Sequence, residues 1–306
     1  METVVRVEGL VKHFGPVKAV DGISFAVGKG EVFGLLGPNG AGKTTTLETI
    51  EGLLAPTSGF TRVLGLDTHR EPQKVKAQVG VQLQASAYFD YLTLSEILEL
   101  FGQLYPRRLP VGELLKRMGL EEKAHTTVGK LSGGQKQRFT VCAALVNDPQ
   151  IVFLDEPTTG LDPQARRNVW DLISEIHREG RTVILTTHYM EEAQFLCQRV
   201  AIIDMGHIVA LDAPISLIHR LPVPYRIKAT FNSQVDQGEL ASLPHVKGVT
   251  LQEDGALSLG SADAARTLAA LQAWASGHHF SLEHLEVLPA TLEDVFLELT
   301  GKRLRD

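Results

Sequence analysis

Residues 37–44 combine the residue types that can hold a phosphate group. The segment reads Gly-Pro-Asn-Gly-Ala-Gly-Lys-Thr and fits the pattern G-x-x-x-x-G-K-[ST]. Its glycines let the backbone curl until several N–H groups point at one anion. Lys43 can then reach the outer phosphates of a bound ligand, and Thr44 can offer its hydroxyl to a magnesium ion. The motif therefore predicts a phosphate-binding site that uses Mg²⁺.

The residues on either side of this loop predict the elements that would position it. Residues 31–36 form a short apolar run, which is typical of a buried strand. From Lys43 to about Glu51, apolar Leu47 and Ile50 lie three apart and predict a helix that ends near Gly52. The N-terminus of that helix adds partial positive charge where an anion would lie. A chance glycine turn would lack this order of strand, loop and helix.

Acidic residues follow a second apolar run. Residues 151–154 are continuously apolar, as in a central parallel strand, and Asp155 and Glu156 follow directly. Ligands of open parallel sheets bind at the carboxyl ends of the strands. Asp155 can hold magnesium through water, and Glu156 can polarise an attacking water as general base or orienting group. His188 follows the predicted strand 181–186 in the same way and could donate a hydrogen bond to a terminal phosphate.

A second glycine-rich turn precedes a helix further along the chain. Residues 131–135 read Leu-Ser-Gly-Gly-Gln, in which Ser132 is a good N-cap for a helix that continues through Leu145. The chain therefore carries two separate phosphate cradles. One nucleotide bound to one subunit does not explain both.

Residues 131–135 match, residue for residue, the signature motif of the ATP-binding cassette (ABC) transporter family. The sequence resembles the ATP-binding subunit of such a transporter over residues 1 to about 220. The resemblance implies an α/β fold of the P-loop NTPase type with an inserted helical subdomain, and an enzyme that hydrolyses ATP with Mg²⁺. It also implies that two copies pack head to tail, so that each signature caps the ATP held by the phosphate loop of the other copy.

Further roles follow from the resemblance one position at a time. Phe14 matches the aromatic residue that stacks on adenine, where the family often has Tyr. Gln84 matches the glutamine that senses magnesium and the attacking water, with Gln82 as a rival two residues earlier. Asp162, in the segment 160–162, matches the acidic residue of the loop that touches the opposite subunit.

The resemblance thus yields three sets of site residues. Catalysis is assigned to Gln84, Glu156 and His188, and magnesium binding to Thr44, Gln84 and Asp155. The ATP contacts are Phe14, Gly37, Pro38, Asn39, Gly40, Ala41, Gly42, Lys43, Thr44, Thr45, Ser132, Gly133, Gly134, Gln135 and Asp162.

The remaining pattern predicts two domains. Up to about residue 220, strands alternate with helices and predict a parallel sheet covered on both faces, with an edge strand at residues 4–10 and a helical subdomain at about 90–147. Two prolines in residues 221–224 mark a boundary. Residues 225–306 predict a small α+β domain. Its last helix, from Thr291 to Leu299, carries one apolar stripe, which we expect to pack on its own domain; a dimer contact is the alternative.

Composition limits where the protein can work. The chain has 306 residues, 43% hydrophobic and 22% charged, with a net charge of −6, which disfavours nonspecific binding to nucleic acid. No apolar run is long enough to span a membrane, no secretory signal is visible, and Cys142 and Cys197 fit buried thiols in a reducing compartment. We therefore expect a cytoplasmic protein, bound to the inner face of the membrane through a separate permease subunit.

Two further expectations concern partners. The aromatic residues Tyr88, Phe89 and Tyr91 could contact the permease or pack locally. Residues 291–296 resemble the end of an extension found on drug-resistance and sodium-type exporters, so the sequence favours an export complex. The alternatives are an ABC protein acting on ribosomes or nucleic acid, and a binding switch that rarely hydrolyses ATP.

Overall fold

The computed structural model describes residues 2–83, 88–233, 235–252 and 255–301 and forms two compact units that divide between Ala213 and Pro214. This division lies before the prolines at 221–224. Helix α8 (Pro214–His219) belongs to the second unit because it packs against the last helix, α11 (Leu292–Thr300). Each unit has its own hydrophobic core.

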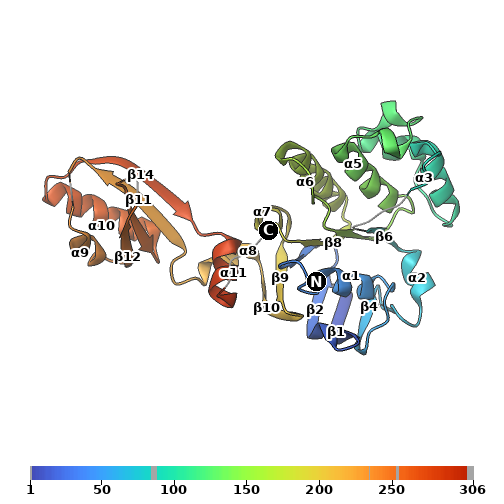
Figure 1. Ribbon diagram of the computed structural model, residues 1–306, viewed down its shortest axis with the longest axis horizontal. Coiled ribbons are helices and arrows are strands. Elements are labelled where there is room, and N and C mark those ends of the chain that lie inside the picture. Colours follow the sequence, from blue (N-terminus) through green and yellow to red (C-terminus); the bar gives the residue numbers. More distant parts are fainter. Residues whose placement is uncertain (1, 84–87, 234, 253–254, 302–306) are drawn as a thin grey trace. The chain divides into compact units, whose positions relative to one another are not determined.

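A six-stranded sheet forms the centre of the first unit (Figure 1). Its neighbouring strands are parallel, except that β10 runs antiparallel to β9. Every residue of β3, β7 and β8 is buried, which explains their continuous apolar runs. Across the sheet the strands are β10 (His207–Asp212), β9 (Arg199–Asp204), β3 (Val32–Leu36), β8 (Thr182–Thr187), β7 (Ile151–Asp155) and β6 (Val79–Gln82).

A second, antiparallel sheet packs against the first around helix α1 (Lys43–Ile50). Phe25 and Phe33, one from each sheet, stack at 5.1 Å. The prediction that residues 4–10 form an edge strand is wrong, because they belong to β1, which lies between β2 and β4. Its alternating pattern reflects a sheet with only one face on the core, which inner antiparallel strands also show. The order is β2 (Val17–Gly28), β1 (Thr3–Phe14), β4 (Ser58–Val63) and β5 (Leu66–Asp67), followed by α2 (Pro72–Lys76).

The predicted helical subdomain consists of α3 (Leu94–Gln103), α4 (Val111–Arg117) and α5 (Gly133–Ala144), with short 3₁₀ turns at Glu121–Lys123 and Val128–Lys130. Tyr88 packs here, with its ring 5.2 Å from that of Phe139. Phe89 and Tyr91 are 56% and 95% exposed. The three aromatic residues therefore divide into one that packs locally and two that face solvent.

The second unit is an antiparallel sheet in the order β12 (Val246–Leu251), β13 (Leu257–Ser261), β11 (Tyr225–Phe231) and β14 (Leu282–Pro289). Helices α9 (Gln237–Ala241) and α10 (Ala264–Gly277) accompany it. The apolar stripe of α11 buries Leu292, Val295 and Phe296 and packs on α8, which belongs to the same compact unit but precedes the predicted domain of residues 225–306.

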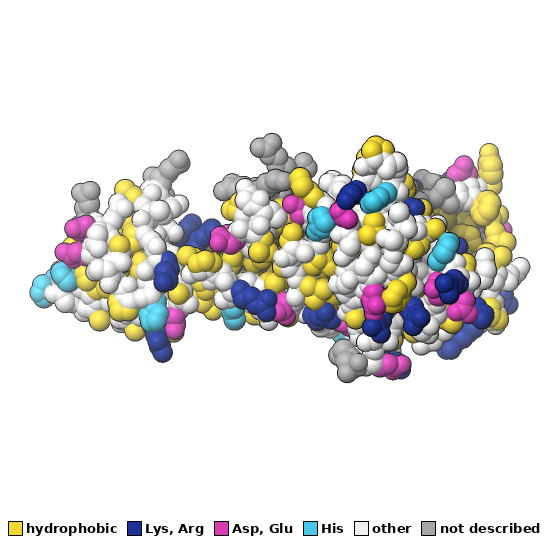
Figure 2. All heavy atoms as spheres, turned by 90° about the horizontal axis from the view of Figure 1, so that it is seen from below, with side chains coloured by type: hydrophobic (Ala, Val, Ile, Leu, Met, Phe, Trp, Pro, Cys, Tyr) yellow, Lys and Arg dark blue, Asp and Glu magenta, His cyan; other side chains and the backbone are white. Residues whose placement is uncertain are grey.

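None of the described helices is both long and apolar enough to cross a bilayer. On the face shown in Figure 2, basic and acidic side chains lie interspersed. That pattern differs from the single-sign basic stripe typical of proteins that bind nucleic acid without sequence preference.

Candidate active site

The phosphate loop connects β3 to α1, and its glycines are required by close backbone packing. A Cβ atom on Gly37 would lie 2.1 Å from the carbonyl oxygen of Ile203, and one on Gly42 would lie 2.3 Å from that of Ala19. Gly42 also has a φ of 104°, in the left-handed region that favours glycine. Substitution at either position would displace the loop.

Helix α1 begins without a side-chain cap, in contrast to the other long helices of this unit. Gly42 occupies the N-cap position, and no described side chain accepts a hydrogen bond there. By comparison, Thr93, Ser132 and Asp162 cap α3, α5 and α6 (Pro163–Arg178) with their side chains. The first N–H groups of α1 therefore lack a side-chain acceptor, and a phosphate fits that place.

Lys43 is a nearly buried cation, 4% exposed, at the start of this helix. Its Nζ donates to the carbonyl oxygens of Gly37 at 2.9 Å and Pro38 at 3.1 Å and lies 3.4 Å from Glu156 Oε1. Burial lowers the pKa of Lys43, and the charge of Glu156 opposes that shift. Both carbonyl partners are loop atoms, so a phosphate oxygen can take their place.

Asp155 and Thr44 together offer oxygen ligands for a magnesium ion. The Thr44 hydroxyl donates to Asp155 Oδ1 at 3.1 Å, and the Thr186 hydroxyl donates to the same oxygen. Burial and the charge of Glu156 raise the pKa of Asp155, although both hydroxyls oppose the rise. A hydroxyl and a carboxylate oxygen beside a phosphate site are the donor set that Mg²⁺ prefers, so these residues fit it.

Glu156 is held in a strained backbone conformation directly after β7. Its φ is 48°, which is uncommon for a residue with a side chain. Its N–H donates to the Thr186 hydroxyl, and its carboxylate accepts from Thr159 at 3.0 Å. His188 Nδ1 lies 3.3 Å from Glu156 Oε1. Burial raises the pKa of Glu156, but Lys43, Thr159 and His188 outweigh it and lower the pKa overall. An ionised carboxylate at the carboxyl edge of the sheet results.

Lys43, Thr44 and Glu156 line one cleft of about 390 Å³, a volume suited to a small-molecule ligand. The Phe14 ring is 48% exposed, and Lys12 Nζ lies 5.0 Å from its centre. The cleft is lined by Phe14, Ala19, Asn39, Gly40, Gly42, Lys43, Thr44, Thr45 and Glu156. A flat apolar face beside a phosphate site suits a nucleotide base.

Comparison with known proteins decides the family. A family model described as ABC transporter matches residues 20–159. The linearmycin resistance ATP-binding protein LnrL of Bacillus subtilis (strain 168) is 38% identical over 99% of this chain and 100% of its own length. The chain belongs to the ABC transporter family. It is an ATP-binding subunit with ATPase activity, and such subunits work as dimers with a separate membrane component.

Further relatives extend the comparison. A Nod factor export ATP-binding protein I of Ralstonia nicotianae (strain ATCC BAA-1114 / GMI1000) is 38% identical over 99% of this chain and 95% of its own length. The daunorubicin resistance ATP-binding protein DrrA2 of Streptomyces coeruleorubidus is 37% identical over 98% and 95%. A solved dimer of the cassette MJ0796, bound to ADP and Pi, superposes with a TM-score of 0.63 at 27% identity and covers 68% of this chain and 98% of that one.

The signature residues of this ABC subunit lie outside its own cleft. Ser132 and Gly133 are exposed, and none of residues 132–135 is among the described residues that line the cleft. Ser132 and Gln135 form a capping box, in which the serine N–H donates to Gln135 Oε1 at 3.0 Å. Asp162 is likewise exposed and caps α6. Within one chain these residues stabilise helix ends, and none of them closes the nucleotide site.

Of the two candidate glutamines at the end of β6, the structure describes Gln82. Gln84 lies outside the described residues, and strand β6 ends at Gln82. Gln82 is 3% exposed, and its amide donates to the carbonyl oxygens of Leu83 at 2.9 Å and Asp155 at 3.3 Å. The rival glutamine therefore contacts the strand end that carries the acids.

Sequence reasoning missed Glu192, a fully buried carboxylate on α7 (Met190–Leu196). It accepts hydrogen bonds from Thr158 at 2.8 Å and Trp170 at 2.9 Å, and burial raises its pKa. It thereby joins the loop after Glu156 to α6 and α7. The available signal was its place beside Ala193 and one turn before Leu196, on the apolar face of α7.

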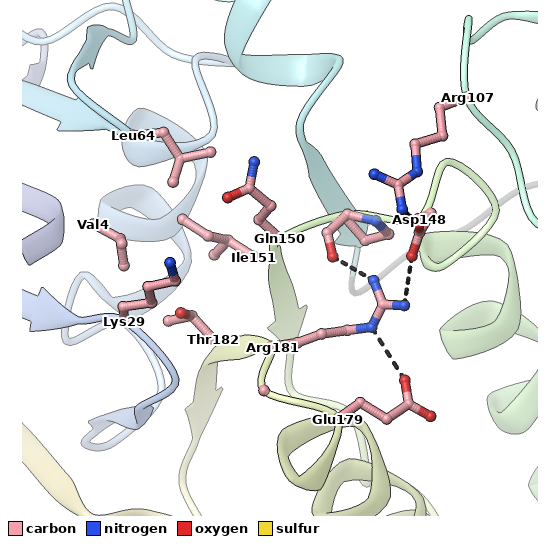
Figure 3. Close-up of a pocket in the computed structure, with 12 residues that line it drawn as sticks. Val4, Lys29, Leu64, Arg107, Asp148, Gln150, Ile151, Glu179, Arg181 and Thr182 are labelled. Carbon is pink, nitrogen blue, oxygen red and sulfur yellow. Dashed lines mark hydrogen bonds and ion pairs between the residues drawn. The ribbon is translucent and has the colours of Figure 1, made fainter. Parts of the chain in front are cut away.

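A second cavity, of about 240 Å³, lies at the opposite edge of the sheet, where β7 and β8 begin (Figure 3). Arg181 Nη2 lies 2.6 Å from Asp148 Oδ1, and Arg181 Nε lies 3.3 Å from Glu179 Oε2. Arg107 pairs with the same aspartate and Arg117 with the same glutamate. The charged groups around this cavity are therefore largely paired with one another.

Proposed function

We propose that this chain is the ATP-hydrolysing subunit of an export complex, in which two copies close head to tail over two ATP molecules. The observation that carries the proposal is the split site. Lys43, Asp155 and Glu156 line or adjoin one cleft, whereas residues 132–135 lie outside it, with Ser132 and Gly133 exposed to solvent. A nucleotide in the cleft is enclosed when the signature residues of a second copy cover it, with Asp162 facing that copy.

The proposed chemistry centres on Glu156, which contacts Lys43 and His188. Glu156, ionised beside Lys43, orients and deprotonates a water for in-line attack on the terminal phosphate. His188, 3.3 Å from the same carboxylate, donates a hydrogen bond to that phosphate. Lys43 and the N-terminus of α1 hold the outer phosphates, and Phe14 stacks on the adenine. Mg²⁺, held by Thr44 and Asp155 with Gln84, neutralises phosphate charge when bound.

Bound ATP favours the closed dimer because it contacts both copies only in that state, and loss of the terminal phosphate removes the bridge. The closing movement drives a separate membrane-spanning permease. Three similar proteins are named for linearmycin resistance, daunorubicin resistance and Nod factor export, which supports export as the direction of transport. The subunit then works on the cytoplasmic face of the membrane.

The test replaces Glu156 by Gln, which keeps the shape and removes the charge. We expect ATP turnover to fall by about 10²–10³-fold while ATP binding survives, so that ATP-dependent dimers accumulate on size-exclusion chromatography. The matched control is Glu71→Gln, which alters an exposed carboxylate paired with Lys74 and should change neither quantity. Unchanged turnover in Glu156→Gln would show that the base is misassigned. A wild-type rate already near that of the variant would instead favour a binding switch.

A further inference from the structure

Strand β14 of the second unit presents a free edge. It pairs only with β11 among the described strands, and all residues from Glu283 to Val287 are exposed. Leu285 and Val287 lie opposite buried Ala229 and Ile227 on the core side of the sheet, yet they remain 44% and 38% exposed. An edge with unpaired N–H and C=O groups and half-covered apolar side chains is a template for a further strand.

The opposite edge, β12, is protected in ways that β14 largely lacks. It contains Gly248, has a register shift between Val246 and Gly248, and packs beside α9. In β14 the one register shift lies at its start, opposite Thr230 and Phe231, and its proline is the last residue. The regular stretch from His284 to Leu288 therefore stays open to pairing.

Hydrogen-bond parity fixes which residues of β14 can pair outward. Ala290 N–H donates to the Pro224 carbonyl oxygen at 2.8 Å, and the register is unbroken from there to His284. Backbone groups alternate in direction along an antiparallel strand. His284, Glu286 and Leu288 therefore point their backbone groups at β11, and Leu285 and Val287 point theirs away from the sheet.

This parity admits an antiparallel pairing of β14 with itself, with the two-fold axis at Leu285. Leu285 then faces Leu285 of the partner subunit through outward N–H and C=O groups. His284 faces Glu286 of the partner subunit, so an imidazole that can donate a hydrogen bond lies opposite a carboxylate, twice by symmetry. The pairing has the same two-fold symmetry as a head-to-tail dimer of the nucleotide-binding units.

We infer that β14 is a second dimer interface, at which the C-terminal sheets of two copies join edge to edge. The inference rests on the proposed function, because that function supplies the second copy. The tethered sheets meet at high effective concentration once the nucleotide-binding units close. The interface would hold two copies together when the nucleotide sites reopen.

The test uses Leu285→Cys in the full chain carrying Glu156→Gln, with ATP and a mild oxidant. Opposed residues in such a ladder lie within disulfide range, and Cys142 and Cys197 are buried and do not compete. We expect a disulfide-linked dimer at least about fivefold more abundant than with Leu251→Cys, an exposed leucine on the other edge strand. Equal cross-linking of the two variants would overturn the inference.

Charge complementarity gives a second arm. Glu286→Lys in the Leu285→Cys background should slow cross-linking about fivefold, and adding His284→Glu should restore it. Failure of the restoration, with both variants folded by circular dichroism, would refute the register. ATP-dependent dimers are followed separately by size-exclusion chromatography. If they form without Leu285 cross-linking, only the β14 interface is wrong; if they do not form, the proposed function fails.

Discussion

Strands β7 and β8 carry charged residues at both ends, and the two ends differ in how those charges are satisfied. At the carboxyl ends, Glu156 lines one cleft with Lys43, Asp155 contacts Thr44 of the same cleft, and α1 begins without a side-chain cap. At the amino ends, Arg181 is shared between Asp148 and Glu179, and further arginines complete the network (Figure 3).

The charged groups at the carboxyl ends can bind a ligand, whereas those at the amino ends stabilise the fold. Charges that are paired with one another stabilise the fold and leave nothing for a ligand. At the carboxyl ends, charged side chains lie close together beside a helix N-terminus whose N–H groups lack an acceptor among the described side chains. Such an arrangement is typical of a site that binds an anionic ligand. Substitutions at the first edge should therefore change activity more than stability, and substitutions at the second edge should do the reverse.

The largest expected effect is on catalysis at the carboxyl edge. Lys43→Met keeps most of the side-chain volume and removes the charge that holds the outer phosphates. We expect ATP hydrolysis to fall by about 10³-fold, because the substitution removes a charge-assisted contact to phosphate in a buried site. Thermal unfolding without nucleotide should shift by only a few degrees, because Thr159 and His188 still contact the Glu156 carboxylate when the lysine is gone. More than a tenth of the wild-type rate would contradict the assignment.

At the amino edge the expected loss is in stability. Arg181→Met leaves Asp148 and Glu179 without their shared partner, and both the arginine and Asp148 are only about an eighth exposed. We expect unfolding in urea to show a loss of about 2 kcal/mol with turnover per folded molecule unchanged. Arg107→Met is the matched control, because this 76% exposed arginine pairs with the same aspartate and should cost less than about 1 kcal/mol. Equal losses would mean that burial does not matter here.

The third effect concerns pH. Burial, with the charges of Asp155 and Glu48, raises the pKa of Glu51, at the end of α1, to about 8, whereas Arg181 and Arg107 outweigh burial and lower the pKa of Asp148. A raised carboxyl pKa means that the folded state binds the proton more tightly. Stability therefore falls as pH rises from about 4.5 to 8. Glu51→Gln should stabilise the protein at pH 7, by about 3 kcal/mol, and have no such effect near pH 4.

Thermal melts across pH 4–8 measure this difference. Glu48, on α1, also has a raised pKa, but the shift is smaller. The stability gained by Glu48→Gln should therefore rise with pH in the same direction and less steeply. Asp148→Asn should destabilise the protein near neutral pH and lose this effect toward acid pH, because a lowered carboxyl pKa contributes stability above its ordinary titration range and loses it as the pH falls through that range. A pH-independent gain for Glu51→Gln would indicate packing as the cause.

Local patterns predicted the elements of this site well. The phosphate loop and the strand before Asp155 could be recognised because their chemistry lies in consecutive residues. The place of β1 inside its sheet could not, because strand order depends on contacts far apart in sequence. Strand β10 and helix α8 were missed because both are short and carry no strong periodicity.

Residues whose partners are distant in sequence were the hardest to predict. Glu192 lies 34 positions from Thr158 and 22 from Trp170, and nothing in its neighbourhood indicates that its carboxylate joins them. Ser132 and Asp162 show the converse. In the proposed head-to-tail dimer their contacts to ATP are made with a second chain, and within the single chain they are helix caps.

The uncapped start of α1 has a consequence beyond binding. No described side chain caps the N-terminus of the helix that carries Lys43 and Thr44. The phosphates of a bound nucleotide would accept hydrogen bonds from its first N–H groups and so act as the helix cap. The free energy of unfolding of the nucleotide-binding unit should therefore rise with the concentration of ATP. At low ATP concentration the unit would be less stable, and it would regain that stability when the ATP concentration rises.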